Sequence, residues 1–276
     1  MSSSENPAVA PFHVVIPARY ASTRFPGKPL VLVAGRAMIL RVVDQARAAG
    51  ARSVLVATDD ERIADAVTAE GFADVAALMT RADHPSGSDR VMEAALLAGL
   101  PDDALVVNVQ GDEPLIPPAA IRQVAQLLSD HQNIGAATLS EAITTTADLL
   151  NPNIVKVVSS EAGRALYFSR APIPHARGLF DQPELLPEQL SDLTSPEQAP
   201  GDAWQRHIGI YGYRLATLKD FVALPVAALE ALESLEQLRL LANGIDLMVA
   251  PSCIAMPGGI DTPEDLVRVE QFLQAR

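Results

Sequence analysis

Cysteine and basic residues are scarce in this sequence, and both shortages exclude classes of protein. The single cysteine, Cys253, rules out a disulfide framework and any metal site built from several thiolates. A chain with one cysteine fits a reducing compartment, so we expect a cytoplasmic protein. Lys and Arg together number 21 against 34 Asp and Glu, a net charge of −13. We therefore exclude a protein that coats nucleic acid, because such proteins carry a basic surface.

Long hydrophobic runs are also missing. Nowhere do about 18 apolar residues follow one another without a charge, so we expect no segment to cross a membrane. Residues 1–11 lack the basic and apolar regions of a signal peptide and are expected to be a disordered lead-in. The hydrophobic content of 49% and charged content of 20% are those of a packed globular protein. We expect a single α/β domain over residues 12–276.

Short β-branched runs alternate with amphipathic stretches through the first half of the chain. The alternation predicts strands at 12–17, 53–58, 75–79 and 104–109, and helices at 38–49, 60–70, 89–98 and 117–129. Such an order is typical of a Rossmann-like, mostly parallel sheet flanked by helices. Ligands of these sheets bind beyond the carboxyl ends of the strands.

The second half follows a different pattern. Segments at 134–138, 154–159, 165–169 and 207–213 look like strands without helices between them, which predicts an antiparallel extension of the sheet. Helices are predicted at 229–242 and 262–274, on either side of a strand at 245–251. The stretch between Pro172 and Asp202 is rich in Pro, Glu and Gln and has no periodicity, so we expect a long mobile loop there.

The loop after the first predicted strand carries an unusual concentration of positive charge. Residues 16–30, IPARYASTRFPGKPL, contain Arg19, Arg24 and Lys28 together with two hydroxyls and a glycine. Lys28 is one of only three lysines in the chain. A solvated surface loop is the alternative, but the position at a strand end favours a polyphosphate site. The loop is neither a P-loop nor a dinucleotide fingerprint, since GxxxxGK[ST] and GxGxxG are absent from it.

Carboxylates follow the most apolar predicted strand. The sequence VQGDEP at 109–114 places Asp112 and Glu113 at the ligand-binding edge, where hard oxygen ligands suit Mg²⁺. A turn with a helix cap is the alternative, and the cationic loop nearby favours the metal. Near the C-terminus, PGGIDTPEDL at 257–266 offers Asp261 or Thr262 as the cap of a following helix. Asp261 could also be a second metal ligand, and spacing alone does not decide this.

Before any resemblance is considered, the residues predict a Mg²⁺-dependent enzyme that handles a nucleoside triphosphate on an α/β sheet. No His, Asp and Ser set demands a covalent nucleophile, so catalysis would rest on positioning and charge neutralisation. Three further clusters, at 80–90, 206–213 and 234–240, stay open between structural and functional roles.

Several stretches together resemble a known family. IPARYASTRFPGKPL, TRADHPSGSDR, NVQGDEPLIP, NPNIVKVV, ALYFSRAPIP, RHIGIYGYR, LESLEQLRLL and PGGIDTPEDL occur from about residue 12 to the C-terminus in the order seen in nucleotide-sugar cytidylyltransferases. The opening motif is shared across that family. RHIGIYGYR, LEQLR and IDTPEDL are similar to those of its members that act on 3-deoxy-manno-octulosonate (Kdo).

The resemblance implies a reaction in which the anomeric 2-hydroxyl of Kdo attacks the α-phosphorus of CTP, giving CMP-Kdo and diphosphate for lipopolysaccharide biosynthesis. It implies a set of CTP-binding residues: Arg19, Lys28, Arg81, Ser86 and Gln110. It implies a set of Kdo-binding residues: Arg170, His207, Tyr211, Glu236 and Gln237. It also implies that Asp112 and Asp261 hold Mg²⁺, with Arg19, Lys28 and Asp112 as the catalytic residues.

The resemblance further implies a homodimer. Residues 12–133 would form the nucleotide-binding half, 134–250 the sugar-binding and dimerisation half, and 251–276 the C-terminal metal motif with its helix. The chain departs from the family in a longer, more acidic loop at 178–202 and in Ser88, where Thr is usual.

Two other functions are compatible with the motifs. One is a cytidylyltransferase for another acidic sugar, such as sialic acid or an amino-substituted Kdo analogue. The other is a non-catalytic nucleotide-sugar-binding protein, whose expected mark is the loss of Asp112, Asp261 or Lys28. All three residues are present.

Overall fold

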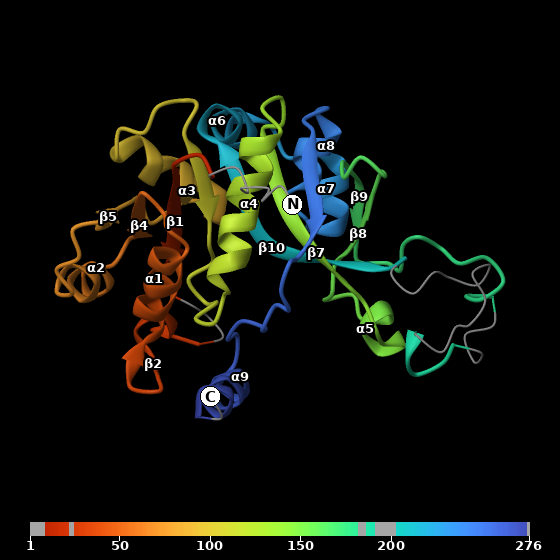
Figure 1. Ribbon diagram of the computed structural model, residues 1–276, viewed down its shortest axis with the longest axis horizontal. Helices are drawn as coiled ribbons and strands as arrows, with labels where there is room; N and C mark the ends of the chain where they lie inside the picture. The colour runs from red at the N-terminus through yellow and green to blue at the C-terminus, as the bar shows by residue number, and fades with distance from the viewer. Residues whose placement is uncertain (1–8, 22–24, 182–185, 191–202, 275–276) are drawn as a thin grey trace, which may run out of the picture.

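A nine-stranded sheet forms the centre of the molecule. The computed structural model describes residues 9–21, 25–181, 186–190 and 203–274 (Figure 1). The sheet strands are β1 (Phe12–Ala18), β4 (Ser53–Thr58), β5 (Val75–Met79), β6 (Leu105–Asn108), β7 (Ala136–Ala142), β8 (Lys156–Ser159), β9 (Ala165–Ser169), β10 (Gln205–Arg214) and β11 (Leu247–Pro251). Seven of them lie in the order β11-β7-β10-β6-β1-β4-β5, and β8 and β9 continue from β10.

The direction of the strands confirms a mostly parallel sheet with antiparallel strands in the second half. Strands β6, β1, β4 and β5 are parallel, as are β11 and β7. Strand β10 runs antiparallel to β6, β7 and β8, and β8 runs antiparallel to β9. The antiparallel strand β10 therefore lies inside the sheet and separates its two parallel parts.

Helices cover both faces of the sheet because successive side chains of a buried strand point to opposite sides. On one side, Val14 and Ile16 pack with α1 (Met38–Ala48), α2 (Glu61–Thr68) and α4 (Pro118–Asp130). On the other, Val15 packs with three helices: α3 (Gly87–Leu97), α6 (Leu215–Ala223) and α8 (Leu238–Ala242). None of the helices within the described ranges is long and apolar enough to span a membrane.

The second half contains more breaks and helices than the sequence predicts. The single helix expected at 229–242 is wrong: Ser234, with a left-handed φ of 52°, separates α7 (Ala228–Glu233) from α8. The stretch between β7 and β8, expected to lack helix, contains the short helix α5 (Thr146–Leu150). Its five residues bury only Leu149, too little to give a helical hydrophobic period.

The two segments expected to be disordered or mobile are only partly described. Of the lead-in, residues 1–8 lie outside the described residues, while Val9 and Ala10 pack against the core. Of the stretch 178–202, residues 182–185 and 191–202 lie outside them. Leu179 and Leu190 from the described parts are buried with Trp204 in a small separate cluster.

The last helix, α9 (Pro263–Gln274), packs on a hairpin formed by β2 (Leu32–Val33) and β3 (Arg36–Ala37). Val33, Ile260 and Val269 are buried together there, and the backbone N–H of Ala34 donates to Glu270 Oε1 over 2.9 Å. This packing brings the C-terminal motif to the loop that follows β1.

Because β10 packs closely against α4, alanine substitutions at two glycines of β10 are predicted to change the stability of the protein differently. A Cβ on Gly212 would lie 2.7 Å from Val124 Cγ1 and 2.9 Å from Leu128 Cδ1, whereas a Cβ on Gly209 would meet nothing within 4 Å. Gly212→Ala is expected to lower the free energy of unfolding by about 1–3 kcal/mol through overpacking. Chemical denaturation measures the change, with Gly209→Ala as the control. Equal stability of the two variants would contradict the packing described.

Candidate active site

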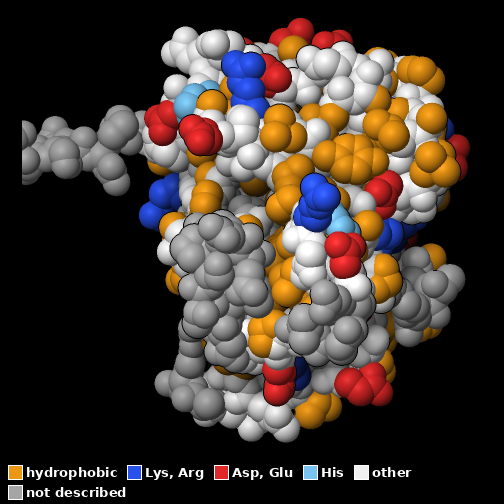
Figure 2. Space-filling view, turned by 90° about the vertical axis from the view of Figure 1, so that its right-hand side faces the viewer, with side chains coloured by type: hydrophobic (Ala, Val, Ile, Leu, Met, Phe, Trp, Pro, Cys, Tyr) orange, Lys and Arg blue, Asp and Glu red, His pale blue; other side chains and the backbone are white. Residues whose placement is uncertain are grey.

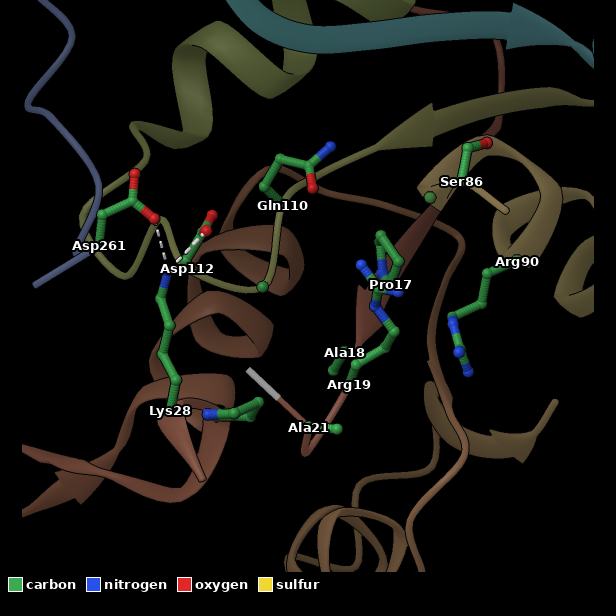
Figure 3. A pocket seen from close by; sticks show the side chains of 13 residues that line it. Pro17, Ala18, Arg19, Ala21, Lys28, Ser86, Arg90, Gln110, Asp112 and Asp261 are labelled. Atoms are coloured by element: carbon green, nitrogen blue, oxygen red, sulfur yellow. Dashed lines mark hydrogen bonds and ion pairs between the residues drawn. The ribbon is translucent and has the colours of Figure 1, made fainter. Parts of the chain in front are cut away.

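A polar cleft of about 450 Å³ lies at the carboxyl ends of β1 and β6. Its lining includes six of the residues predicted to bind nucleotide or metal: Arg19, Lys28, Ser86, Gln110, Asp112 and Asp261 (Figure 3). Because the ends of parallel strands are where such sheets bind ligands, the location agrees with a substrate site. Arg24, the third cation of the predicted loop, lies outside the described residues.

Glycines allow the loops of the cleft to approach one another. A Cβ on Gly111 would lie 2.9 Å from the carbonyl oxygen of Pro17, so only glycine lets the loop after β6 lie this close to β1. Gly27 has a left-handed φ of 69° and precedes the short 3-10 helix η1 (Lys28–Leu30). This turn places Lys28 at the base of the cleft.

The ammonium of Lys28 joins the two predicted metal ligands. Lys28 Nζ lies 2.8 Å from Asp112 Oδ2 and 3.0 Å from Asp261 Oδ1, and the lysine is only 9% exposed (Figure 3). The two carboxylates would repel each other without a cation between them. The arrangement therefore gathers two carboxylates around one positive charge, and carboxylate oxygens are the donors that Mg²⁺ takes from proteins.

The structure distinguishes the two roles considered for Asp261. Thr262 Oγ1 accepts a hydrogen bond from Asp265 N over 3.3 Å, and Asp265 Oδ2 accepts one from Thr262 N over 3.0 Å. This reciprocal pair is a capping box, so Thr262 caps α9 and the carboxylate of Asp261 is used elsewhere. The backbone of Ile260 donates to Asp112 O over 2.9 Å, which ties the two aspartates together.

Glu113, the second carboxylate expected at this edge, does not line the cleft. It packs beside Gly259, behind the loop that carries Asp112. Burial, followed by the negative charge of Asp112, raises the pKa of Glu113 to about 7. The expected pair of cleft carboxylates at 112 and 113 is thus corrected to Asp112 and Asp261.

The opposite wall of the cleft comes from the start of α3. Ser86 caps this helix by accepting from Asp89 N over 3.3 Å. Arg90 also lines the cleft, although sequence reasoning did not select it. It is 1% exposed and donates to Asp59 Oδ2 over 3.0 Å and to Thr80 Oγ1 over 2.6 Å. Its spacing of four residues from Ser86, which places both on one helix face, is the signal that could have found it.

Arg81, predicted to bind CTP, is not part of the cleft lining. Its guanidinium pairs with Asp83 in the same exposed loop, with the closest atoms 2.9 Å apart. Within that loop, His84 Nε2 lies 2.5 Å from Glu93 Oε2, and Arg81 N donates to the same oxygen over 2.9 Å. The loop is therefore held to α3 by Glu93.

A second cluster, formed by His207, Tyr211 and Glu236, contains three of the predicted Kdo-binding residues. The ring centroids of His207 and Tyr211 are 5.2 Å apart, and His207 Nε2 lies 3.1 Å from Thr138 Oγ1. Burial lowers the pKa of His207 to about 3 and raises that of Tyr211. Both rings are therefore uncharged at neutral pH.

Glu236 joins this second cluster to the cleft. Its Oε2 accepts from Ser88 Oγ over 3.1 Å, two residues beyond Ser86. Burial raises the pKa of Glu236, and hydrogen bonds from the serines partly offset that effect. Gln237, the remaining residue expected on this turn, is buried beside it. The start of α3 thus contacts both the cleft and the second cluster.

Arg170 is held by backbone groups. Its Nε donates to Glu233 O over 2.7 Å, Nη1 to Pro152 O over 3.0 Å and Nη2 to Ser234 O over 3.3 Å. In this arrangement the guanidinium fixes the end of α7 and the left-handed turn at Ser234. The residues of that turn lead directly to Glu236 and Gln237.

Fold and site together define an α/β protein with a cleft of charged and polar side chains at the strand ends. A family described as cytidylyltransferase matches residues 13–247, and the chain belongs to this family. It is therefore a nucleotidyltransferase, as predicted from the motifs.

Named relatives agree with this assignment. The chain is 51% identical to a 3-deoxy-manno-octulosonate cytidylyltransferase of Alcanivorax borkumensis over 95% of this chain and 98% of the relative. It is 54% identical to one of Pseudomonas fluorescens over 96% and 98% of the two chains. A solved structure described as CMP:2-keto-3-deoxy-manno-octonic acid synthetase complexed with CTP has a TM-score of 0.81 and 38% identity, covering 96% of this chain and 99% of that one.

The buried neutral His207 predicts a dependence of stability on pH. Its folded pKa of about 3 lies below the unfolded value near 6.5, so between these values the unfolded state binds more protons. Its contribution destabilises the protein as the pH falls below about 6.5, by up to about 1.4 kcal/mol per pH unit. His207→Gln should remove this slope. Denaturant unfolding at pH 7.5, 6 and 5 measures it, and parallel curves for the two proteins would disprove the effect.

Proposed function

We propose that the protein transfers CMP from CTP to the anomeric 2-hydroxyl of Kdo, releases diphosphate and so activates Kdo for lipopolysaccharide biosynthesis in the cytoplasm. The observation that carries the proposal is the convergence of Lys28, Asp112 and Asp261 in a cleft at the strand ends. Extensive identity to cytidylyltransferases of this name supports the choice of sugar.

The cleft suits the triphosphate of CTP. Arg19 can grip phosphate oxygens in a bidentate manner, and Lys28 adds a compact charge. Ser86 and Gln110 offer a hydroxyl and an amide for the remainder of the nucleotide. For Arg81, nucleotide binding requires that its guanidinium leave Asp83, and we propose that CTP competes for it.

Asp112 and Asp261 are the residues that would hold Mg²⁺, because both carboxylates already face one positive charge. When bound, the ion supplies charge neutralisation on the phosphates and the leaving diphosphate. Lys28 contributes a fixed positive charge beside the two carboxylates. These residues would keep the triphosphate in place while the sugar approaches.

The second cluster suits an acidic sugar with several hydroxyls. His207, Tyr211, Glu236 and Gln237 offer uncharged and hydrogen-bonding groups in a buried setting. Arg170 either holds the turn that presents Glu236 or exchanges its carbonyl partners for the sugar carboxylate. We propose the first role, because all three nitrogen positions of its guanidinium are engaged with carbonyls.

Transfer requires one bond to form and one to break. The 2-hydroxyl oxygen loses its proton to solvent and bonds to the α-phosphorus, and the bond from that phosphorus to the bridging oxygen breaks, so diphosphate leaves. Holding both substrates beside the start of α3 supplies the alignment for this displacement. No residue of the chain needs to bond covalently to the substrate.

We further propose that two copies associate through the face that carries β9 and α7. Hydrophobic side chains are exposed on that face (Figure 2). Leu166 of β9 is 60% exposed and Leu232 of α7 is 83% exposed. Exposed apolar groups gathered on one face are typical of an association surface. Light scattering after gel filtration should give twice the chain mass of 29.3 kDa, and the chain mass itself would refute the dimer.

Diphosphate release from CTP tests the proposed function. Kdo, sialic acid and an amino-substituted Kdo analogue are supplied separately with Mg²⁺. We expect turnover with Kdo and a kcat/KM at least about tenfold lower with the other acids, since the buried sugar groups are matched to one pattern of hydroxyls. Turnover with another acid but not with Kdo would show that the other acid is the substrate. No turnover with any of the three acids would refute the proposed function.

Asp112→Asn tests the cation site. The substitution removes one negative charge from the pair and should lower kcat/KM by about 10²–10³-fold, since a metal site supplies several kcal/mol to the transition state. Diphosphate release at several Mg²⁺ concentrations measures the effect. Glu113→Gln is the matched control, because its carboxylate is adjacent in sequence but lies outside the cleft lining. Wild-type activity of Asp112→Asn at limiting Mg²⁺ would contradict the assignment.

A further inference from the structure

Three buried polar atoms beside the cleft have no hydrogen-bond partner among the described residues. They are Asn108 Oδ1, the hydroxyl of Tyr211 and Glu236 Oε1. Buried polar atoms are nearly always paired, because an unpaired one has lost its bonds to water without compensation. Tyr211 and Glu236 already belong to the second cluster. Asn108 has no role in the function described so far.

Asn108 lies next to Tyr211. The two residues are direct partners in the antiparallel pairing of β6 with β10, so their side chains are on the same face of the sheet. Glu236 is close as well: after burial and the neighbouring Tyr213, its negative charge contributes to the raised pKa of Tyr211. The three atoms that lack a hydrogen bond therefore come from β6, from β10 and from the turn between α7 and α8, which meet at one place.

Asn108 also lies between the second cluster and the nucleotide cleft. On its other side it pairs with Val15 of β1, two residues before Pro17, and it precedes Gln110 by two residues. Both Pro17 and Gln110 line the cleft. Asn108 is 3% exposed, so its amide is part of the buried floor that connects the two regions.

We propose that Asn108 is a sugar-binding residue whose side-chain carbonyl accepts a hydrogen bond from a hydroxyl of the acidic sugar, on the side of the sugar nearest the cleft. This inference rests on the proposed function. An amide oxygen accepts from a hydroxyl but repels a carboxylate, so it selects the orientation of the sugar. Tyr211 and Glu236 offer the neighbouring polar atoms. This hydrogen bond would hold the sugar hydroxyl next to β6, the strand that leads to Asp112.

Asn108→Leu tests the proposal, because leucine has a similar size and no acceptor. We expect the KM for Kdo to rise about tenfold, the loss of one hydrogen bond, while the KM for CTP stays within about threefold. The melting temperature of the substrate-free protein should not fall, because the acceptor has no partner there. Gln123→Leu is the control: its amide is paired at both ends, with Pro251 O and Cys253 N, so it should lower the melting temperature without changing either KM.

Other outcomes overturn the proposal. Unchanged kinetics would show that Asn108 does not contact the sugar. A lower melting temperature with equal changes in both KM values would show a structural role. Wild-type turnover with CTP and Kdo, measured in the same assay, separates this failure from failure of the proposed function.

A structure of the wild-type protein with Kdo and a non-hydrolysable CTP analogue gives a second test that does not depend on the variant's folding. A sugar oxygen within about 3.2 Å of Asn108 Oδ1 is expected. An ordered water bonded to that atom, or an atom still unpaired, would overturn the proposal.

Discussion

The interaction on which the site depends is the pairing of one buried ammonium with two carboxylates. Lys28 meets Asp112 and Asp261, which lie 84 and 233 residues away along the chain. Each partner comes from a different structural unit: a turn after β1, a loop after β6 and the segment before α9. Without the lysine, two negative charges would face each other in a half-buried cleft. The two ion pairs therefore hold three segments together that are distant along the chain.

The cleft and the second cluster lie next to each other and differ in the charge of their side chains. The cleft is built from ionised groups, as suits a polyanion and its counter-ion. In the neighbouring cluster, burial keeps the ring of His207 deprotonated and that of Tyr211 protonated, beside the carboxyl group of Glu236. The start of α3 belongs to both, through Ser86 and Ser88. One acidic chain thus presents charged side chains in the cleft and uncharged rings in the neighbouring cluster.

Local sequence patterns were sufficient to predict most helices and strands and most of the residues predicted to bind nucleotide or metal that line the cleft. The strands at 53–58, 75–79 and 165–169 have the predicted bounds, because their apolar runs end at clear turn signals. The cleft residues follow from the rule that ligands bind at strand ends. The insertion of β10 and the break at Ser234 were not predictable, since strand pairing and a left-handed backbone depend on tertiary contacts.

Side-chain roles set by partners were also beyond the sequence. Nothing in the motif ALYFSRAPIP shows that Arg170 donates to three carbonyls. The unpaired oxygen of Asn108 likewise becomes visible only when neighbouring strands are in place. Within residues 257–266, by contrast, the structure shows that Thr262 is the helix cap and that Asp261 pairs with Lys28, whereas the role of Asp261 as a metal ligand stays a prediction.

The packing of α9 on the β2–β3 hairpin has a consequence for the order in which the protein matures. During synthesis Lys28 emerges 233 residues before Asp261. The last strand of the described sheet, β11, ends at Pro251, so the core can form before Asp261 reaches Lys28. The sheet can therefore fold first, and the ion pair that joins α9 to the loop after β1 closes afterwards.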